Sequence, residues 1–295
     1  MSSGKRSVVS PDANARFEYP RPQLERREWL CLNGKWDYVG GKQIASALNP
    51  ARPIDFGKTA EKILVPYCPE SVLSGVERKQ EINMWYRRTF EIPSAWEGKQ
   101  VIINFDAVDH DATIFVNGEK AGSHSGGYSS FQFNITRFLK TGFNTVVVAA
   151  HDPNDGKTPS GKNGPRGDYT FTSGIWQSVW LEPVSEQHIE NIRILPDLAN
   201  SRLELIVNAS TASSSLKITA LDGGKIVAEK SGSSSKQIFL PIKEPRLWSP
   251  DSPFLYDLTI QLLDKKGAVL DDVKSYFGMR EVKMEKVNGV VRPLL

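Results

Sequence analysis

Residues 101–183 read VIINFDAVDHDATIFVNGEKAGSHSGGYSSFQFNITRFLKTGFNTVVVAAHDPNDGKTPSGKNGPRGDYTFTSGIWQSVWLEP. Asn117-Gly118 follows an apolar run, and this dipeptide best satisfies the two positive φ angles of a two-residue hairpin turn. Residues 131–135 alternate apolar and polar side chains, as in a strand buried on one face. Residues 145–150 are apolar throughout, as in a strand covered on both faces. The stretch therefore predicts short β-strands joined by tight turns.

A long polar loop, residues 151–167, separates the last two predicted strands of this stretch. Loops of this length in a compact domain are usually either functional or disordered. The strand that follows places Ile175, Val179 and Leu181 on one face and two tryptophans on the other. The loop is thus the first place to look for a site.

Size and composition limit the classes of protein that fit. A chain of 295 residues is long enough for two domains, each with its own core. The net charge of +3 and the absence of a basic run argue against a nucleic-acid partner. No apolar run approaches the ~20 residues that span a bilayer. The N-terminus has no signal-peptide pattern, so the cytoplasm is the default location.

Cys31 and Cys68 fit either a disulfide or two buried thiols.

The second half of the chain has another character, with fewer aromatic residues and shorter predicted strands. The candidates are residues 189–195, 202–208, 216–221, 225–230, 236–240, 255–263 and 269–276. Roughly seven strands in about 100 residues, separated by turn signals, are typical of an immunoglobulin-like sandwich. The pattern therefore predicts an all-β protein with two sandwiches.

Several motifs, each weak alone, occur in one order along the chain. They are Leu32-Asn33-Gly34-Lys35-Trp36, Val65-Pro66-Tyr67-Cys68-Pro69-Glu70-Ser71, Trp85-Tyr86-Arg87-Arg88-Thr89-Phe90, Val116-Asn117-Gly118, Ser173-Gly174-Ile175-Trp176, the run from Leu247 to Tyr256, and Phe277-Gly278-Met279-Arg280. The ordered set, over about residues 25–292, resembles the N-terminal half of glycoside hydrolase family 2. That family includes β-galactosidases, β-glucuronidases and β-mannosidases.

The resemblance implies a domain order. Residues 1–16 are expected to be a disordered lead-in, and 17–184 a jelly-roll β-sandwich of the galactose-binding, or sugar-binding, type. Residues 185–285 are expected to form an immunoglobulin-like β-sandwich, and 286–295 the start of a linker to a catalytic barrel. The family carries both catalytic glutamates in that barrel, and no residues here match its motifs. We therefore assign no catalytic residue, expect a truncated or fragmentary chain, and predict that it is inactive alone.

The resemblance also points to residues that contact sugar. An aspartate shortly before the Ser/Ala-Gly-Ile segment contacts the sugar in the family, and Asp168, six residues before Gly174, matches it. A carboxylate suits this role because it accepts charge-assisted hydrogen bonds from hydroxyl groups. The alternative for Asp168 is a turn aspartate bonded to its own backbone. Asp152 and Asp155, in the same loop, are weaker candidates, because loop acids are more often simply solvated.

Two other patterns resemble a nucleotide-binding or metal-binding motif, but neither fits the motif fully. Residues 156–163 nearly spell a phosphate-binding loop, yet Asn163 stands where Mg²⁺ binding needs Ser or Thr, and no helix follows. Asp109-His110-Asp111 invites a metal or triad interpretation. Successive side chains of a strand point to opposite faces, however, so a polar strand end fits this tripeptide better. We expect no cofactor and no metal.

The sequence thus predicts the non-catalytic N-terminal half of a β-glycosidase of family 2. Its partner would be a terminal β-linked sugar, bound together with the missing barrel, with neither nucleic acid nor membrane. The alternatives are a free-standing carbohydrate-binding or adhesion module and a purely structural pair of sandwiches. The identity of the sugar and the oligomeric state stay open.

Overall fold

The computed structural model describes residues 15–41, 44–58, 60–153, 170–211, 214–287 and 290–294. It divides into two compact units, which are described one at a time. The first contains residues 28–183 with the segment that ends at Pro20, and the second contains Arg21–Arg27 with the chain from Val184 onward. In the described residues, helical structure is limited to short 3₁₀ turns, and none of it is long and apolar enough to cross a membrane.

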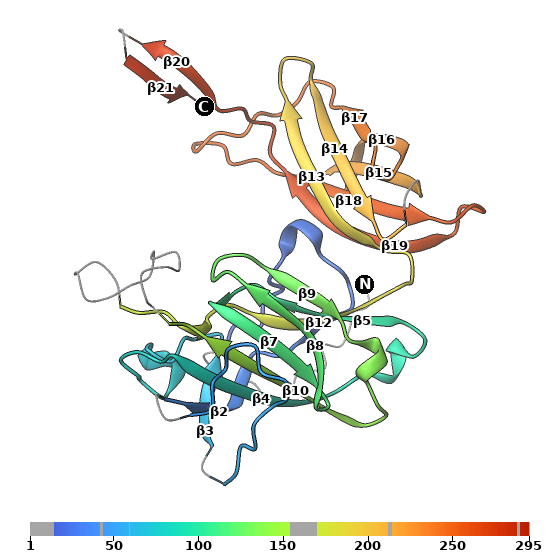
Figure 1. Cartoon of the computed structure of the whole chain (residues 1–295). Coiled ribbons are helices and arrows are strands. Elements are labelled where there is room, and N and C mark those ends of the chain that lie inside the picture. Colours follow the sequence, from blue (N-terminus) through green and yellow to red (C-terminus); the bar gives the residue numbers. More distant parts are fainter. Residues whose placement is uncertain are drawn as a thin grey trace. The chain divides into compact units, whose positions relative to one another are not determined.

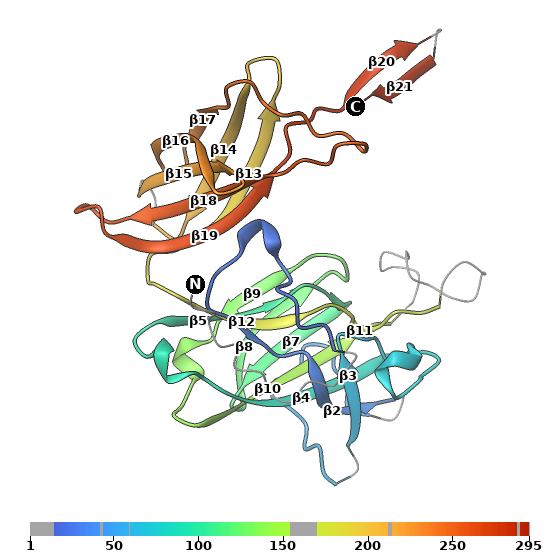
Figure 2. The same ribbon diagram turned by 180° about the vertical axis from the view of Figure 1, so that it is seen from behind.

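The first unit is an antiparallel β-sandwich, as predicted. Its strands are β1 (Leu30–Cys31), β2 (Gly34–Gly40), β3 (Glu61–Val65), β4 (Asn83–Glu91), β5 (Gln100–Phe105), β6 (Val108–Asp109), β7 (Asp111–Val116), β8 (Glu119–Ser125), β9 (Phe131–Asn134), β10 (Phe143–His151), β11 (Gly174–Ile175) and β12 (Val179–Val184). Its 3₁₀ turns are η2 (Val72–Ser74), η3 (Ser94–Trp96) and η4 (Thr136–Phe138). A four-stranded sheet of order β1-β12-β5-β9 faces a six-stranded sheet of order β3-β2-β4-β10-β7-β8 (Figures 1 and 2).

Strand β10 shows why the first sandwich needs an apolar run at its centre. Val146 and Val148 point into the main core between the sheets. Val147 and Ala149 point the other way, into a second cluster that the loop after β2 covers with Phe56. The prediction of a strand buried on both faces is confirmed, because the loop shields the outer face of the large sheet.

The predicted hairpin turn is also confirmed. Asn117 and Gly118 have φ angles of 51° and 89° and join β7 to β8. The Asn117 side chain ties the turn to its neighbours as well, since its Nδ2 donates to Phe138 O and to Asn144 Oδ1, both at 2.8 Å. This asparagine therefore satisfies both the turn geometry and a local hydrogen-bond network.

The second unit contains an immunoglobulin-like sandwich. Its strands are β13 (Ile189–Asp197), β14 (Arg202–Ala209), β15 (Ser215–Asp222), β16 (Lys225–Ser233), β17 (Gln237–Pro241), β18 (Tyr256–Leu263) and β19 (Val269–Phe277). A three-stranded sheet, β13-β14-β17, faces a four-stranded sheet, β16-β15-β18-β19. All seven predicted strands are present. Alternate residues fill the core, such as Leu203, Leu205 and Val207 of β14, which matches the period of two expected for half-buried strands.

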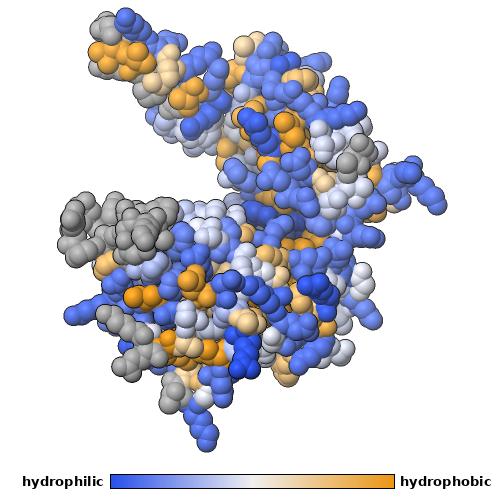
Figure 3. Space-filling model, viewed as in Figure 1, coloured by the Kyte–Doolittle hydropathy of each residue, from blue (hydrophilic) through white to orange (hydrophobic). Residues whose placement is uncertain are grey.

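Both ends of the second unit add segments outside the seven strands. Residues 21–27, predicted within the first domain, lie in the second unit and include the 3₁₀ turn η1 (Pro22–Leu24). A hairpin of β20 (Lys283–Val287) and β21 (Val290–Leu294) spans the end of the predicted second domain and most of the predicted linker at residues 286–295. The face in Figure 3 is mainly hydrophilic, with a hydrophobic area over this hairpin, where Met284, Val290 and Val291 are exposed.

The two cysteines, whose pairing the sequence left open, are both free. Each is half-buried, and burial raises the pKa of each thiol to about 11. The cysteines therefore behave as protonated packing side chains near neutral pH.

Candidate functional site

The candidate site lies where the long loop leaves β10 and where the chain returns to β11. Asp155 and Asp168 lie outside the described residues, so their predicted roles remain predictions. Asp152 is described: it directly follows β10, its backbone N–H donates to Ile82 O at 2.9 Å, and its side chain is buried. This acid stands at the base of the loop, in a more enclosed position than a solvated loop carboxylate.

A second carboxylate, Asp109, is buried at the same end of the sandwich. Asp109 lies in β6, which pairs with β11 so that Asp109 stands opposite Gly174. Only 8% of the residue is accessible. Both β6 and β11 contact β10, which places Asp109 beside the point where the loop begins. The sequence suggested only a polar strand end, and the pairing of β6 with β11 makes that end part of the candidate site.

Glycines let the backbone approach this carboxylate. A Cβ on Gly127 would lie 2.2 Å from Asp109 Oδ1, so no other residue fits at this position without movement. Gly174 has a φ of +66°, and a Cβ there would lie 2.1 Å from the hydroxyl oxygen of Tyr86. The Ser-Gly-Ile-Trp motif thus needs its glycine for both conformation and space.

Two aromatic side chains complete the described part of the site. Trp176 Nε1 donates to Gly127 O at 2.8 Å, which fixes the indole against the glycine turn. The rings of Tyr128 and Trp176 meet edge to face, with centroids 6.3 Å apart. Tyr128 is 53% exposed. Its pKa is raised, first by partial burial and then by the negative charges of Asp109 and Asp152. These two aspartates, Tyr128 and Trp176 are here called the rim cluster.

The end of the loop is fixed by a contact between two distant motifs. Ser173 is fully buried, and its backbone N–H donates to Glu70 Oε2 at 3.2 Å. The Ser173 hydroxyl donates to the other carboxylate oxygen of Glu70. Glu70 belongs to the Val-Pro-Tyr-Cys-Pro-Glu-Ser motif, so the two motifs hold the segment that follows Asp168. Sequence reasoning recorded both motifs and missed their contact, because nothing local signals it.

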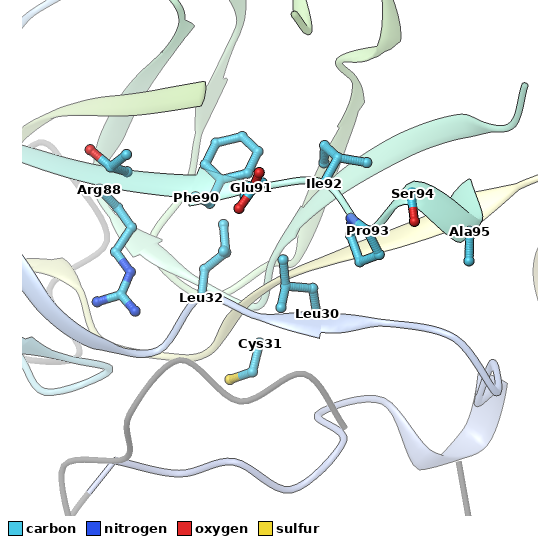
Figure 4. A pocket seen from close by; sticks show the side chains of 11 residues that line it. Leu30, Cys31, Leu32, Arg88, Phe90, Glu91, Ile92, Pro93, Ser94 and Ala95 are labelled. Atoms are coloured by element: carbon cyan, nitrogen blue, oxygen red, sulfur yellow. The ribbon is translucent and has the colours of Figure 1, made fainter. Parts of the chain in front are cut away.

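A separate groove of about 540 Å³ opens in the first unit between β1 and the end of β4. Figure 4 shows Leu30 and Leu32 facing Phe90 and Pro93, with the Arg88 side chain at one end. Asp152, the one predicted sugar-contacting residue that the structure describes, does not line this groove. The buried core residues Leu30, Leu32 and Phe90 form its floor, and no rim-cluster residue lines it.

No metal centre is formed in the described part of the chain, where no three His, Cys, Asp or Glu side chains are grouped as ligands. His110 Nδ1 lies 3.4 Å from Asp111 Oδ2, and Asp111 also accepts a hydrogen bond from the Ser125 hydroxyl. Carboxylates and aromatic rings are the groups that the described part of the site offers to a ligand.

Comparison with known proteins shows which family shares the sequence and fold of this chain. Residues 65–184 match the model of the glycosyl hydrolases family 2 sugar binding domain, and residues 187–280 match a second model, glycosyl hydrolases family 2. A β-galactosidase of Thermoanaerobacter pseudethanolicus is 28% identical, over 87% of this chain and 36% of its own length. A putative β-glucuronidase of Formosa agariphila is 33% identical, over 89% of this chain and 32% of its own length.

Solved structures agree with the sequence matches. The β-glucuronidase of Lactobacillus rhamnosus superposes with a TM-score of 0.72 at 25% identity, covering 89% of this chain and 46% of the other. The β-glucuronidase of Ruminococcus gnavus in complex with D-glucuronic acid has a TM-score of 0.71 at 23% identity, covering 91% of this chain and 49% of the other, and shows the shared fold. The chain spans about a third of the length of its curated relatives, in their N-terminal part. The chain therefore belongs to glycosyl hydrolase family 2 and contains the family's sugar-binding domain followed by its immunoglobulin-like domain.

Proposed function

We propose that the first sandwich supplies the sugar-facing rim of a β-glycosidase active site, and that the second sandwich is its scaffold. The observation that carries the proposal is the rim cluster, which lies at the base of the loop that holds Asp155 and Asp168. Carboxylates accept charge-assisted hydrogen bonds from sugar hydroxyls. Aromatic faces pack against the apolar faces of sugar rings.

The proposed role is binding and orientation, without bond cleavage. A retaining glycosidase needs a nucleophile and an acid/base carboxylate about 5–5.5 Å apart on either side of the scissile bond. The family resemblance assigns both groups to a barrel, so Asp109, Asp152 and Asp168 are left to hold hydroxyl groups. Relatives named β-galactosidase and β-glucuronidase make a terminal β-linked sugar the expected substrate class.

Assays on the purified 295-residue chain test directly whether these two sandwiches lack hydrolytic activity of their own. With nitrophenyl β-galactoside and β-glucuronide, the purified protein is expected to release nitrophenol no faster than buffer. Isothermal titration with galactose and glucuronic acid at millimolar concentration is expected to give no heat of binding, because the family resemblance assigns the opposing half of the site to a barrel. Hydrolysis well above the buffer rate would contradict the proposal.

A free-standing carbohydrate-binding module is the second candidate, and the exposure of Tyr128 favours it. An exposed ring fixed beside Trp176 is a surface on which a sugar could stack without a barrel. This candidate predicts millimolar or tighter binding that Tyr128→Ala abolishes and Phe143→Ala, at another exposed aromatic residue of the same unit, leaves unchanged. The same titration therefore separates the two candidates.

A further inference from the structure

The segment at residues 21–27 has an unusual position, because it precedes most of the first sandwich in the chain and packs in the second unit. Glu25 pairs with Lys274 of β19 through two backbone hydrogen bonds of 2.9 Å, one in each direction. Strand β19 is at the edge of its sheet. Edge strands carry unpaired backbone groups, so the segment covers part of an edge that β19 would otherwise expose.

Arg26 anchors the segment through a buried ion pair. Its Nη2 donates to Asp271 Oδ2 at 2.8 Å and its Nε to Asp271 Oδ1 at 3.3 Å. The two side chains are only 6% and 9% exposed. A buried charge of this kind is tolerated where its partner and hydrogen bonds are complete.

The same anchor joins the two sheets of the second sandwich. Arg26 Nη2 also donates to the backbone oxygen of Ile189 at 2.6 Å, and Asp271 Oδ2 accepts the N–H of Ile189 at 2.8 Å. Ile189 begins β13 in the three-stranded sheet, whereas Asp271 lies in β19 of the four-stranded sheet. Arg26 therefore closes a polar network that spans both layers at their edge.

The pattern of burial along the segment is that of a strand with one face inward. Leu24 is buried and packs in the core of the second sandwich, and Arg26 is 5% exposed. Glu25 and Arg27, the intervening and following residues, are exposed. This alternation with a period of two gives the segment an apolar anchor and a polar anchor on the same side.

We propose that residues 21–27 are an integral element of the second sandwich, which reaches its full stability only with this segment from ahead of the first sandwich. The edge of β19 is thus an acceptor surface, and its occupant is a short extended segment of this same chain with Leu24 and Arg26 as anchors. The family match to the second domain begins at residue 187, so an immunoglobulin-like unit cut at that boundary lacks both anchors.

Hydrogen exchange on the full 295-residue chain tests this proposal, with Arg26→Met as the variant and Arg27→Met as the matched control. Loss of one partner of a buried ion pair is expected to lower the protection of amides in β13, β14, β18 and β19 by about a hundredfold or more. Amides in β4, β7 and β10 of the first sandwich are expected to keep their protection. Arg27→Met is expected to change protection in either unit by less than about threefold.

A second variant keeps the test informative if Arg26→Met does not fold. Leu24→Ala leaves the ion pair intact and removes the apolar anchor, so protection is expected to fall in the same four strands. The proposal is overturned if Arg26→Met and Arg27→Met behave alike, or if the loss of protection is confined to residues 21–27. Either result would mean that the segment lies on the second sandwich without completing it.

Discussion

The two sandwiches bury different kinds of side chain. The first has large aromatic residues in its interior, such as Trp36, Trp85 and Tyr86, and buries the polar groups Asp109, Asp152 and Ser173 at the end that carries the long loop. The second has a mainly aliphatic core of alternating Leu, Ile and Val residues, and its buried Arg26 forms an ion pair at an edge. Buried polar groups cost free energy unless they are paired, so their concentration at this end of the first sandwich supports the proposal that the end binds a ligand.

The largest difference in stability between the two units is expected when a glycine in each is replaced by alanine. Gly174→Ala meets both a φ of +66° and a Cβ contact of 2.1 Å with Tyr86, so we expect the first unit to lose about 2–4 kcal/mol of unfolding free energy. Gly224→Ala has a φ of +87° and open space around its Cβ, so about 1 kcal/mol is expected there. Urea unfolding of both variants checks the comparison, and equal losses would show that packing at Gly174 is not tight.

Carboxylates give the next comparison. Glu70→Gln removes the charge that accepts both hydrogen bonds from Ser173, and we expect a loss of about 1.5–3 kcal/mol in the stability of the first unit. Glu204→Gln, in a surface network with Arg202 on the second sandwich, is expected to cost less than about 1 kcal/mol. If Glu204→Gln proves the more damaging in urea unfolding, the contact between the two motifs is not what holds the end of the loop.

The smallest effect concerns ionisation at the rim cluster. The Tyr128 pKa lies above the ordinary value of tyrosine, with burial the first cause and the carboxylates the second. Removing a negative charge favours the phenolate, so Asp109→Asn is expected to lower the pKa of Tyr128, and Asp257→Asn on the second sandwich to leave it unchanged. Titration of the tyrosine ring carbons by NMR, with Tyr128→Phe for assignment, measures both. An unchanged Tyr128 pKa in Asp109→Asn would show that the Asp109 carboxylate does not influence the ionisation of Tyr128.

Local sequence signals were sufficient for most of the fold. The Asn117-Gly118 turn, the apolar run of β10 and the spacing of the seven strands in the second half each depend on neighbouring residues. Those signals determine which residues form strands and turns and which side of each strand is buried, so they are enough to predict the two sandwiches. The ordered motifs then identified the family.

The candidate site depends on contacts that no local pattern encodes. Asp109 joins the rim cluster through the pairing of β6 with β11, and Glu70 reaches Ser173 across 103 residues of sequence. The segment at residues 21–27 was assigned to the first domain, because the alternation around Arg26 is too short to reveal its partner in β19. In each case tertiary pairing decided the outcome, and sequence patterns carry no direct record of it.

The central claim is that the first sandwich contacts sugar and the second does not. It is tested most directly in a longer protein that carries these residues ahead of a catalytic barrel, by comparing Asp168→Asn with Asp251→Asn, an exposed control on the second sandwich. A charged hydrogen bond to a hydroxyl is worth roughly 1.5–3 kcal/mol, so Asp168→Asn is expected to lower kcat/KM about tenfold to a few hundredfold. The melting temperature should not change in either variant, and Asp251→Asn should retain full activity. An unchanged kcat/KM in Asp168→Asn would contradict the account, and a sharp fall in its melting temperature would make this residue a structural turn aspartate.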